Sequence, residues 1–137
     1  MGSKKYLLKS NYETLFALYL YFNNISYSYE SLSFEYCDTG GKHHIYTPDF
    51  IIGNKLYEVK GTNKVSPDLY LNLIERGEAC IRSGYQFNVV LAETVDKIEN
   101  YLSRIIDISR LKSDISIHDS SRDYLILDED TLKQYLL

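Results

Sequence analysis

The sequence is most informative between residues 46 and 61, which read YTPDFIIGNKLYEVKG. Gly53 and Asn54 form a pair typical of a two-residue hairpin turn, and largely apolar, extended residues lie on both sides of it. A two-residue turn fixes which residues of the two strands face each other. The predicted pairs are Ile52 with Lys55, Ile51 with Leu56, Phe50 with Tyr57, and Asp49 with Glu58. Because the flanking residues are apolar on both faces, we expect this hairpin to lie inside a sheet.

Two acidic residues, Asp49 and Glu58, are predicted to project from the same face of this hairpin. Like charges directly opposite each other are destabilising, so such a pair beside an apolar core needs a compensating cation, and a divalent metal is the simplest candidate. Lys60 leaves the strand on the same face as Glu58, where it could contact a phosphate or orient an attacking water. Val59 points into the core, and its backbone carbonyl is a further candidate metal ligand.

A simpler interpretation places Asp49 and Glu58 on the surface of an edge hairpin. Lys60 and Lys55 would then be their solvated ionic partners, and the pair would have no chemical role. The apolar neighbours on both strands favour the interior position instead.

The rest of the chain alternates between helical and extended patterns. A helix is predicted over residues 10–22, with Ser10 as its N-cap and Glu13 at the capping-box position. A second helix begins at Ser66-Pro67 and runs to about Ser83. Its apolar stripe is predicted to face the core and comprises Leu69, Tyr70, Leu73, Ile74, Cys80 and Ile81. The predicted strands cover residues 27–29, 32–36, 44–52, 55–61 and 87–91.

The C-terminal part of the sequence has weaker patterns. Helical spacing follows Thr94, extended segments are predicted at 114–118 and 124–127, and a short helix is predicted after Asp128. The whole order, helix, strands, helix, strand and helical tail, predicts an α/β domain with a mixed sheet.

The motif resembles that of the PD-(D/E)XK nuclease superfamily, with Pro48-Asp49 followed after eight residues by Glu58-Val59-Lys60. The upstream order is similar to that of phage junction-resolving and TnsA-like transposon endonucleases. The resemblance covers roughly residues 10–92. It implies a restriction-endonuclease-like core, a mixed sheet flanked by helices in αβββαβ order, within a single nuclease domain over residues 1–137. Residues 93–137 would be an extension of helices and a strand.

The same resemblance implies hydrolysis of DNA phosphodiester bonds with Mg²⁺, for which Mn²⁺ would substitute. In that family the acidic residues of the motif bind metal and the lysine serves the nucleophile or the phosphate, which assigns these roles to Asp49, Glu58 and Lys60. An acidic residue from the preceding helix often assists, and Glu13 matches that place, although its capping position explains it equally well. The alternative acidic contributors are Glu30 and, after it, Glu35.

Contacts to nucleic acid are expected from basic residues near this motif, namely Lys64, Lys42 and His43. Cutting both strands of a duplex would require two sites, so a homodimer is expected. The alternative is a non-catalytic nucleic-acid-binding or assembly subunit that keeps the nuclease fold. The sequence does not distinguish DNA from RNA as the substrate.

Composition limits the remaining possibilities. The formal net charge is -4 and the pI about 5.3, which excludes a basic protein that coats DNA by neutralising phosphates. Cys37 and Cys80 are too far apart in sequence to indicate a zinc cluster and are expected to be free thiols. With no signal-peptide pattern and no long apolar run, the expected location is the reducing cytoplasm of a bacterium or a phage-infected cell, with no membrane partner.

Overall fold

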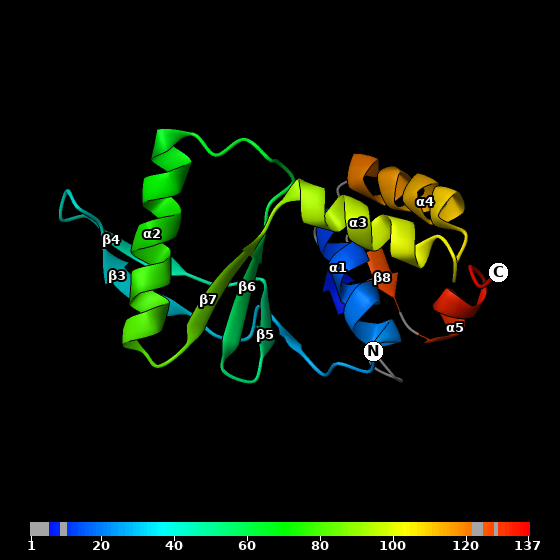
Figure 1. The fold of residues 1–137 in the computed structure, drawn as a ribbon, viewed down its shortest axis with the longest axis horizontal. Coiled ribbons are helices and arrows are strands. Elements are labelled where there is room, and N and C mark those ends of the chain that lie inside the picture. The colour runs from blue at the N-terminus through cyan, green and yellow to red at the C-terminus, as the bar shows by residue number, and fades with distance from the viewer. Residues whose placement is uncertain (1–5, 9–10, 122–124, 128) are drawn as a thin grey trace. The chain divides into compact units, whose positions relative to one another are not determined.

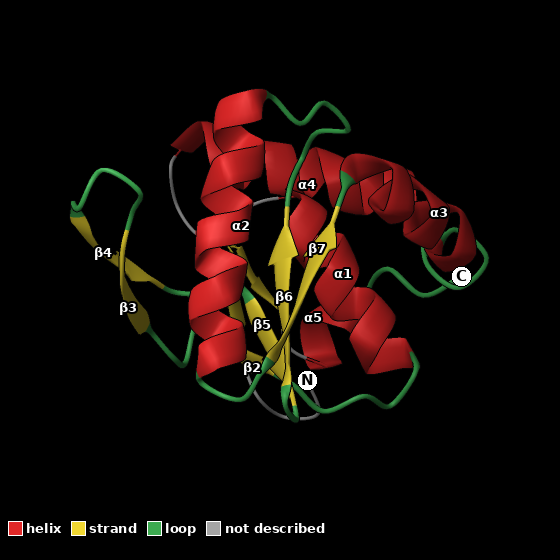
Figure 2. Ribbon diagram, turned by 60° about the vertical axis from the view of Figure 1, so that its left-hand side comes forward, coloured by secondary structure: helices red, strands yellow, loops and turns green. Residues whose placement is uncertain are grey.

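The computed structural model describes residues 6–8, 11–121, 125–127 and 129–137. Its helices are α1 (Asn11–Phe22), α2 (Pro67–Arg82), α3 (Ala92–Leu102), α4 (Ile108–Ser121) and α5 (Glu129–Lys133). Its strands are β1 (Tyr6–Leu8), β2 (Ser28–Tyr29), β3 (Phe34–Cys37), β4 (His43–Tyr46), β5 (Phe50–Ile52), β6 (Lys55–Val59), β7 (Gln86–Val90) and β8 (Leu125–Leu127). The chain has a mixed α/β fold (Figures 1 and 2).

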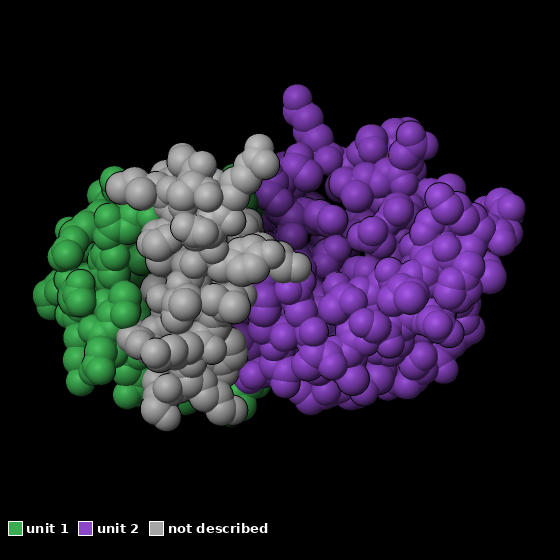
Figure 3. All heavy atoms as spheres, turned by 180° about the vertical axis from the view of Figure 1, so that it is seen from behind, with its two compact units in different colours: residues 1–26, 92–137 green, residues 27–91 purple. Residues whose placement is uncertain are grey.

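The chain divides into two compact units, which are coloured separately in Figure 3. Residues 27–91 form the sheet unit, and residues 1–26 together with 92–137 form the terminal unit. The sheet unit is continuous in sequence and contains the whole predicted motif. The single nuclease domain expected from the sequence remains a prediction.

The sheet unit is built on four strands in the order β2-β5-β6-β7. The β2–β5 and β5–β6 pairs are antiparallel and the β6–β7 pair is parallel, which gives the mixed sheet that the sequence predicts. Parallel neighbours need a crossover connection, and α2 supplies it between β6 and β7 (Figure 2). Along the chain, five strands (β2 to β6) lie between α1 and α2, where the predicted αβββαβ order has three.

The hairpin formed by β5 and β6 has the predicted register. Ile52 pairs with Lys55, Ile51 with Leu56, and Phe50 with Tyr57. Gly53 takes a φ of 61° in the turn, a backbone conformation that glycine adopts without steric cost.

The chain departs from the prediction just before this hairpin. One extended run was expected over residues 44–52, but the structure contains two strands, β4 and β5, separated by Thr47, Pro48 and Asp49. Because proline has no backbone N–H to donate to a ladder, it favours this interruption. β4 pairs with β3 in a separate two-stranded sheet, and β5 then joins the four-stranded sheet.

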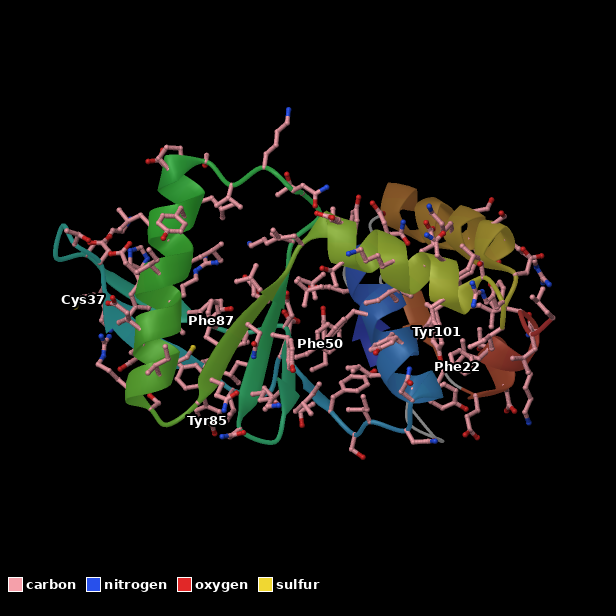
Figure 4. The ribbon with its side chains drawn as sticks, in the orientation of Figure 1. Phe22, Cys37, Phe50, Tyr85, Phe87 and Tyr101 are labelled. Carbon is pink, nitrogen blue, oxygen red and sulfur yellow. The ribbon has the colours of Figure 1, made fainter. Side chains whose placement is uncertain are left out.

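Helix α2 begins as predicted. The Ser66 side chain accepts a hydrogen bond from the Leu69 N–H at 3.2 Å, and Pro67 occupies the first turn. Gly77 packs closely on β7, since an added Cβ would lie 2.8 Å from the Phe87 ring. Figure 4 shows Phe87 beside α2. The core of the sheet unit lies under this helix and comprises Tyr36, Tyr46, Ile51, Leu56, Ala79 and Cys80.

The apolar stripe of α2 is buried in part. Leu73 and Cys80 are buried, and burial raises the pKa of the Cys80 thiol to about 11, with the charge of Glu58 adding to the shift. Tyr70 and Ile81 are each 61% exposed and Ile74 is 38% exposed, so the prediction that these three belong to the core is wrong. All three line an apolar groove between α2 and β7.

The terminal unit packs α1 against α3 and pairs β1 with β8. α1 is buried over most of its length, as predicted, while its expected N-cap Ser10 lies outside the described residues. Residues 114–118, expected to be extended, belong to α4. Ile108, Leu111 and Ile115 have helical spacing in the sequence, and this period explains the difference.

Candidate active site

Asp49 lies at the point where the chain enters β5, at the end of the β5–β6 ladder. Its carboxylate Oδ2 accepts a hydrogen bond from the Val59 N–H at 2.7 Å. Its backbone carbonyl accepts a hydrogen bond from the Glu30 N–H at 3.0 Å. The ladder ends at the Phe50–Tyr57 pair, so the expected direct pairing of Asp49 with Glu58 is not part of it. Asp49 is instead fixed against the backbone at the end of β6.

Glu58 is a buried carboxylate with two cationic partners. It is 5% exposed, and its Oε2 lies 3.4 Å from the Lys60 Nζ and 3.3 Å from the Arg76 Nη1. The Lys60 contact confirms that the two side chains leave the same face of the strand. A buried carboxylate is costly unless it is paired, and these two cations provide the pairing.

Tyr46, the last residue of β4, completes the surroundings of Glu58. The Arg76 guanidinium carbon lies 4.8 Å from the centroid of the Tyr46 ring, a cation–π contact. Burial raises the pKa of Tyr46 far above its usual value, and the charge of Glu58, a hydrogen bond to Glu58 and the charge of Asp49 raise it further. Both carboxylates therefore act on the same hydroxyl, which stays protonated.

Sequence reasoning missed Arg76 and Tyr46 as site residues. A signal for Arg76 was present, because Leu69, Leu73, Arg76 and Cys80 follow the spacing of one helix face. A charged residue on the buried face of an amphipathic helix requires a buried partner. No comparable pattern singles out Tyr46 among the 14 tyrosines of the chain.

The carboxylate oxygens at this end of β6 are the kind of ligand that a hard cation prefers. Mg²⁺ prefers oxygen ligands, keeps several waters, and is usually bound through one or two carboxylates, which Asp49 and Glu58 can supply. Within the described residues, no group of three or more His, Cys, Asp or Glu is placed to bind a metal ion. A structural zinc site is therefore a poor fit, whereas a magnesium ion that keeps several waters is compatible with these residues. The role of the Val59 carbonyl as a ligand stays a prediction.

The other acidic candidates fall in different places. Glu13 lies in the first turn of α1 and is buried, but it belongs to the terminal unit, so its support of the site stays a prediction. Glu30 has a φ of 48°, uncommon for a residue other than glycine, and its backbone is bonded to Asp49. Glu35 is exposed on β3, where it pairs with Ile45 of β4.

The basic candidates lie in two regions of the sheet unit. Lys64 is exposed in the loop that follows β6 and Lys60, where its N–H donates to the Thr62 Oγ1 at 3.0 Å. Lys42 and His43 are exposed at the turn of the β3–β4 hairpin, which projects away from β6 (Figure 1). Lys64 is therefore close to Lys60 in sequence, whereas Lys42 and His43 lie on a separate hairpin, and the contacts of all three with nucleic acid stay predictions.

Comparisons of the chain with protein-family models, with curated proteins and with solved structures found no match. Among the helices of the described residues, none has the length and apolar character needed to cross a membrane.

Proposed function

We propose that this chain is a magnesium-dependent endonuclease that hydrolyses phosphodiester bonds in DNA, with a restriction-endonuclease-like core. The observation that carries the proposal is the meeting of Asp49, Glu58 and Lys60 at one end of β6. Asp49 contacts this end through the Val59 amide, and Lys60 contacts Glu58 directly. The spacing of these residues is also that of the PD-(D/E)XK motif.

The residues of the site have distinct tasks in this proposal. Asp49 and Glu58 bind Mg²⁺, or Mn²⁺ in its place, with the Val59 carbonyl as a further contributor. When bound, such an ion lowers the pKa of its water and stabilises negative charge on the phosphate. Lys60 orients that water or neutralises the phosphate. Lys64 contacts the DNA backbone beside it.

The substrate in this proposal is DNA, with branched or junction DNA as one form to be tested. The chain carries a formal net charge of -4, so affinity must come from local cations and bound metal, not from the overall charge. A homodimer would supply the second site that is needed to cut both strands.

A cleavage assay with a matched lysine control tests the proposal. The substrates are supercoiled plasmid, linear duplex, single-stranded DNA, a four-way junction and RNA, each with Mg²⁺, with Mn²⁺ and with EDTA. We expect metal-dependent cleavage by the wild type and a loss of about 10²-fold or more in Lys60→Ala, since an aligned proton-transfer or charge contact contributes at least that much. Lys55→Ala, on an exposed residue of the same strand, should cleave like the wild type.

Two results would contradict the proposal. One is a wild type that cleaves none of these substrates and binds no Mg²⁺ in a calorimetric titration. The other is equal activity in Lys60→Ala and the wild type. The form of nucleic acid that is cleaved best would separate the junction, nicking and RNA alternatives.

A second candidate is a non-catalytic nucleic-acid-binding subunit, and one observation favours it. Glu58 already has two side-chain cations within 3.4 Å, so its charge is balanced without metal. This candidate predicts DNA binding that EDTA does not weaken, together with no cleavage of any substrate in the assay.

A further inference from the structure

Two buried polar atoms beside Glu58 lack a hydrogen bond of standard geometry to any described residue. They are the Nε of Arg76 and the hydroxyl of Tyr46. Buried polar groups are nearly always bonded, and each exception requires an explanation. Both atoms can donate a hydrogen bond, and both belong to side chains that stack on each other. The Tyr46 hydroxyl interacts with Glu58 outside that geometry, whereas the Nε of Arg76 has no partner among the described residues. An acceptor from outside the chain would supply the hydrogen bond that the Arg76 Nε lacks.

The two donors are presented by regular elements. Tyr46 ends β4 and is 5% exposed, and Arg76 lies within α2. The acceptor would therefore meet a hydroxyl carried by β4 and a guanidinium carried by α2.

The charges nearby indicate what kind of acceptor would bind. Lys60 and Arg76 both contact the same oxygen of Glu58, at 3.4 and 3.3 Å. Once the charge of Glu58 is neutralised, as binding of a divalent cation would do, both cations become available to another anion. A phosphodiester carries one negative charge shared by its two non-bridging oxygens, and these oxygens match the planar donor array of an arginine.

We propose that Arg76 and Tyr46 form the phosphate-binding part of the site, and that Arg76 exchanges its contact with Glu58 for one with the phosphate of the nucleic acid. This inference rests on the proposed function for the identity of the ligand. It adds two residues to the motif and assigns to Arg76 a contact with substrate.

The exchange can be tested without metal, because Glu58→Gln removes the charge that engages Arg76. The measurement is the Kd of a fluorescein-labelled DNA duplex by fluorescence anisotropy in EDTA. Glu78→Gln, on an exposed residue of α2, changes the net charge equally and serves as the control. We expect Glu58→Gln to bind about tenfold more tightly than Glu78→Gln, since a charge-assisted hydrogen bond is of that size.

Second substitutions in the Glu58→Gln chain identify the residues responsible. Arg76→Met should abolish the gain and reduce the salt dependence of binding by about one phosphate contact. Arg82→Met, which removes an exposed arginine from the end of the same helix, should leave most of the gain intact. Tyr46→Phe should weaken binding, and its melting temperature is measured alongside because the hydroxyl also interacts with Glu58.

Two outcomes would overturn this inference: no gain in Glu58→Gln beyond that of the control, or equal effects of Arg76→Met and Arg82→Met. Should Glu58→Gln fail to fold, the wild type and Tyr46→Phe are compared in Ca²⁺, where equal Kd values would also overturn it. The result is independent of catalysis. If the protein cleaves no substrate but shows the Arg76-dependent gain in affinity, the proposed hydrolysis is refuted and the phosphate site stands. If it cleaves DNA but shows no such gain, only the phosphate site is refuted.

Discussion

Glu58 shows how the charges of single residues define this site. The sequence predicts that the acidic pair needs a compensating cation, and a metal ion was the simplest candidate. The structure supplies Lys60 and Arg76 in that place. A metal ion at Asp49 and Glu58 would therefore compete with two side-chain cations, and its affinity should depend on where those cations can go. The phosphate-binding role inferred for Arg76 gives this cation a second partner.

Asp49 allows a prediction that separates its structural contact from its charge. In Asp49→Ala the Val59 N–H loses its acceptor, and an unpaired buried donor costs about 1–3 kcal/mol. Asp49→Asn keeps an acceptor oxygen and lowers the repulsion with Glu58, so its free energy of unfolding should equal or exceed that of the wild type. The measurement is urea unfolding in EDTA.

Cleavage assays complete this comparison, since both Asp49 variants lack the carboxylate expected to bind metal. Both should be inactive even though their stabilities differ. Equal stability of Asp49→Ala and Asp49→Asn would contradict the structural role of the Val59 contact. Full activity of Asp49→Asn would contradict the role of Asp49 in binding metal.

Single residues also show which contacts of the site could be predicted from the sequence and which could not. Glu58 and Lys60 could be placed on one face because a strand alternates with a fixed period. The contact between Arg76 and Tyr46 joins α2 to β4, and no local period relates residues of two such elements. Asp49 lies one residue beyond the ladder, where strand periodicity no longer applies.

At the scale of elements, the local signals were the reliable ones. The Gly53-Asn54 turn fixed the register of β5 and β6, and Ser66-Pro67 marked the start of α2, because each acts over a few residues. The division of residues 44–52 into two strands was not predicted. It depends on β4 pairing with β3 while β5 pairs with β2 and β6, and those are choices among distant partners.

The packing of α2 on β7 leads to a prediction for Gly77. A Cβ at this position would lie 2.8 Å from the Phe87 ring, and overpacking of this kind costs about 1–3 kcal/mol. Alanine is better than glycine in a helix by about 1 kcal/mol, which offsets part of the cost. We therefore expect Gly77→Ala to lower the free energy of unfolding in urea by up to about 2 kcal/mol.

A double-mutant cycle identifies the cause of that loss. Phe87→Leu removes the ring that the new methyl group would contact, so the loss caused by Gly77→Ala should be smaller in the Phe87→Leu chain. Additive effects of the two substitutions would show that the Phe87 ring is not what limits position 77.

At the scale of the whole molecule, the grouping of the chain into units could not be foreseen from sequence patterns. Residues 1–26 and 92–137 share one unit, although residues 27–91 lie between them in sequence. The contacts responsible include α1 with α3 and β1 with β8. Such pairings depend on tertiary packing, to which periodicity and turn signals are insensitive.

This grouping predicts that a core substitution in one unit loosens that unit first. Leu102 in α3 is fully buried in the terminal unit, and Leu102→Ala should cost about 2–5 kcal/mol. Hydrogen exchange measured by mass spectrometry should then speed up in α1 and α3, which pack together, while β6 and β7 of the sheet unit stay protected. Leu56→Ala in β6 is the matched control and should expose β6 and β7 instead. Equal acceleration throughout both chains would mean that the two units unfold as one cooperative structure.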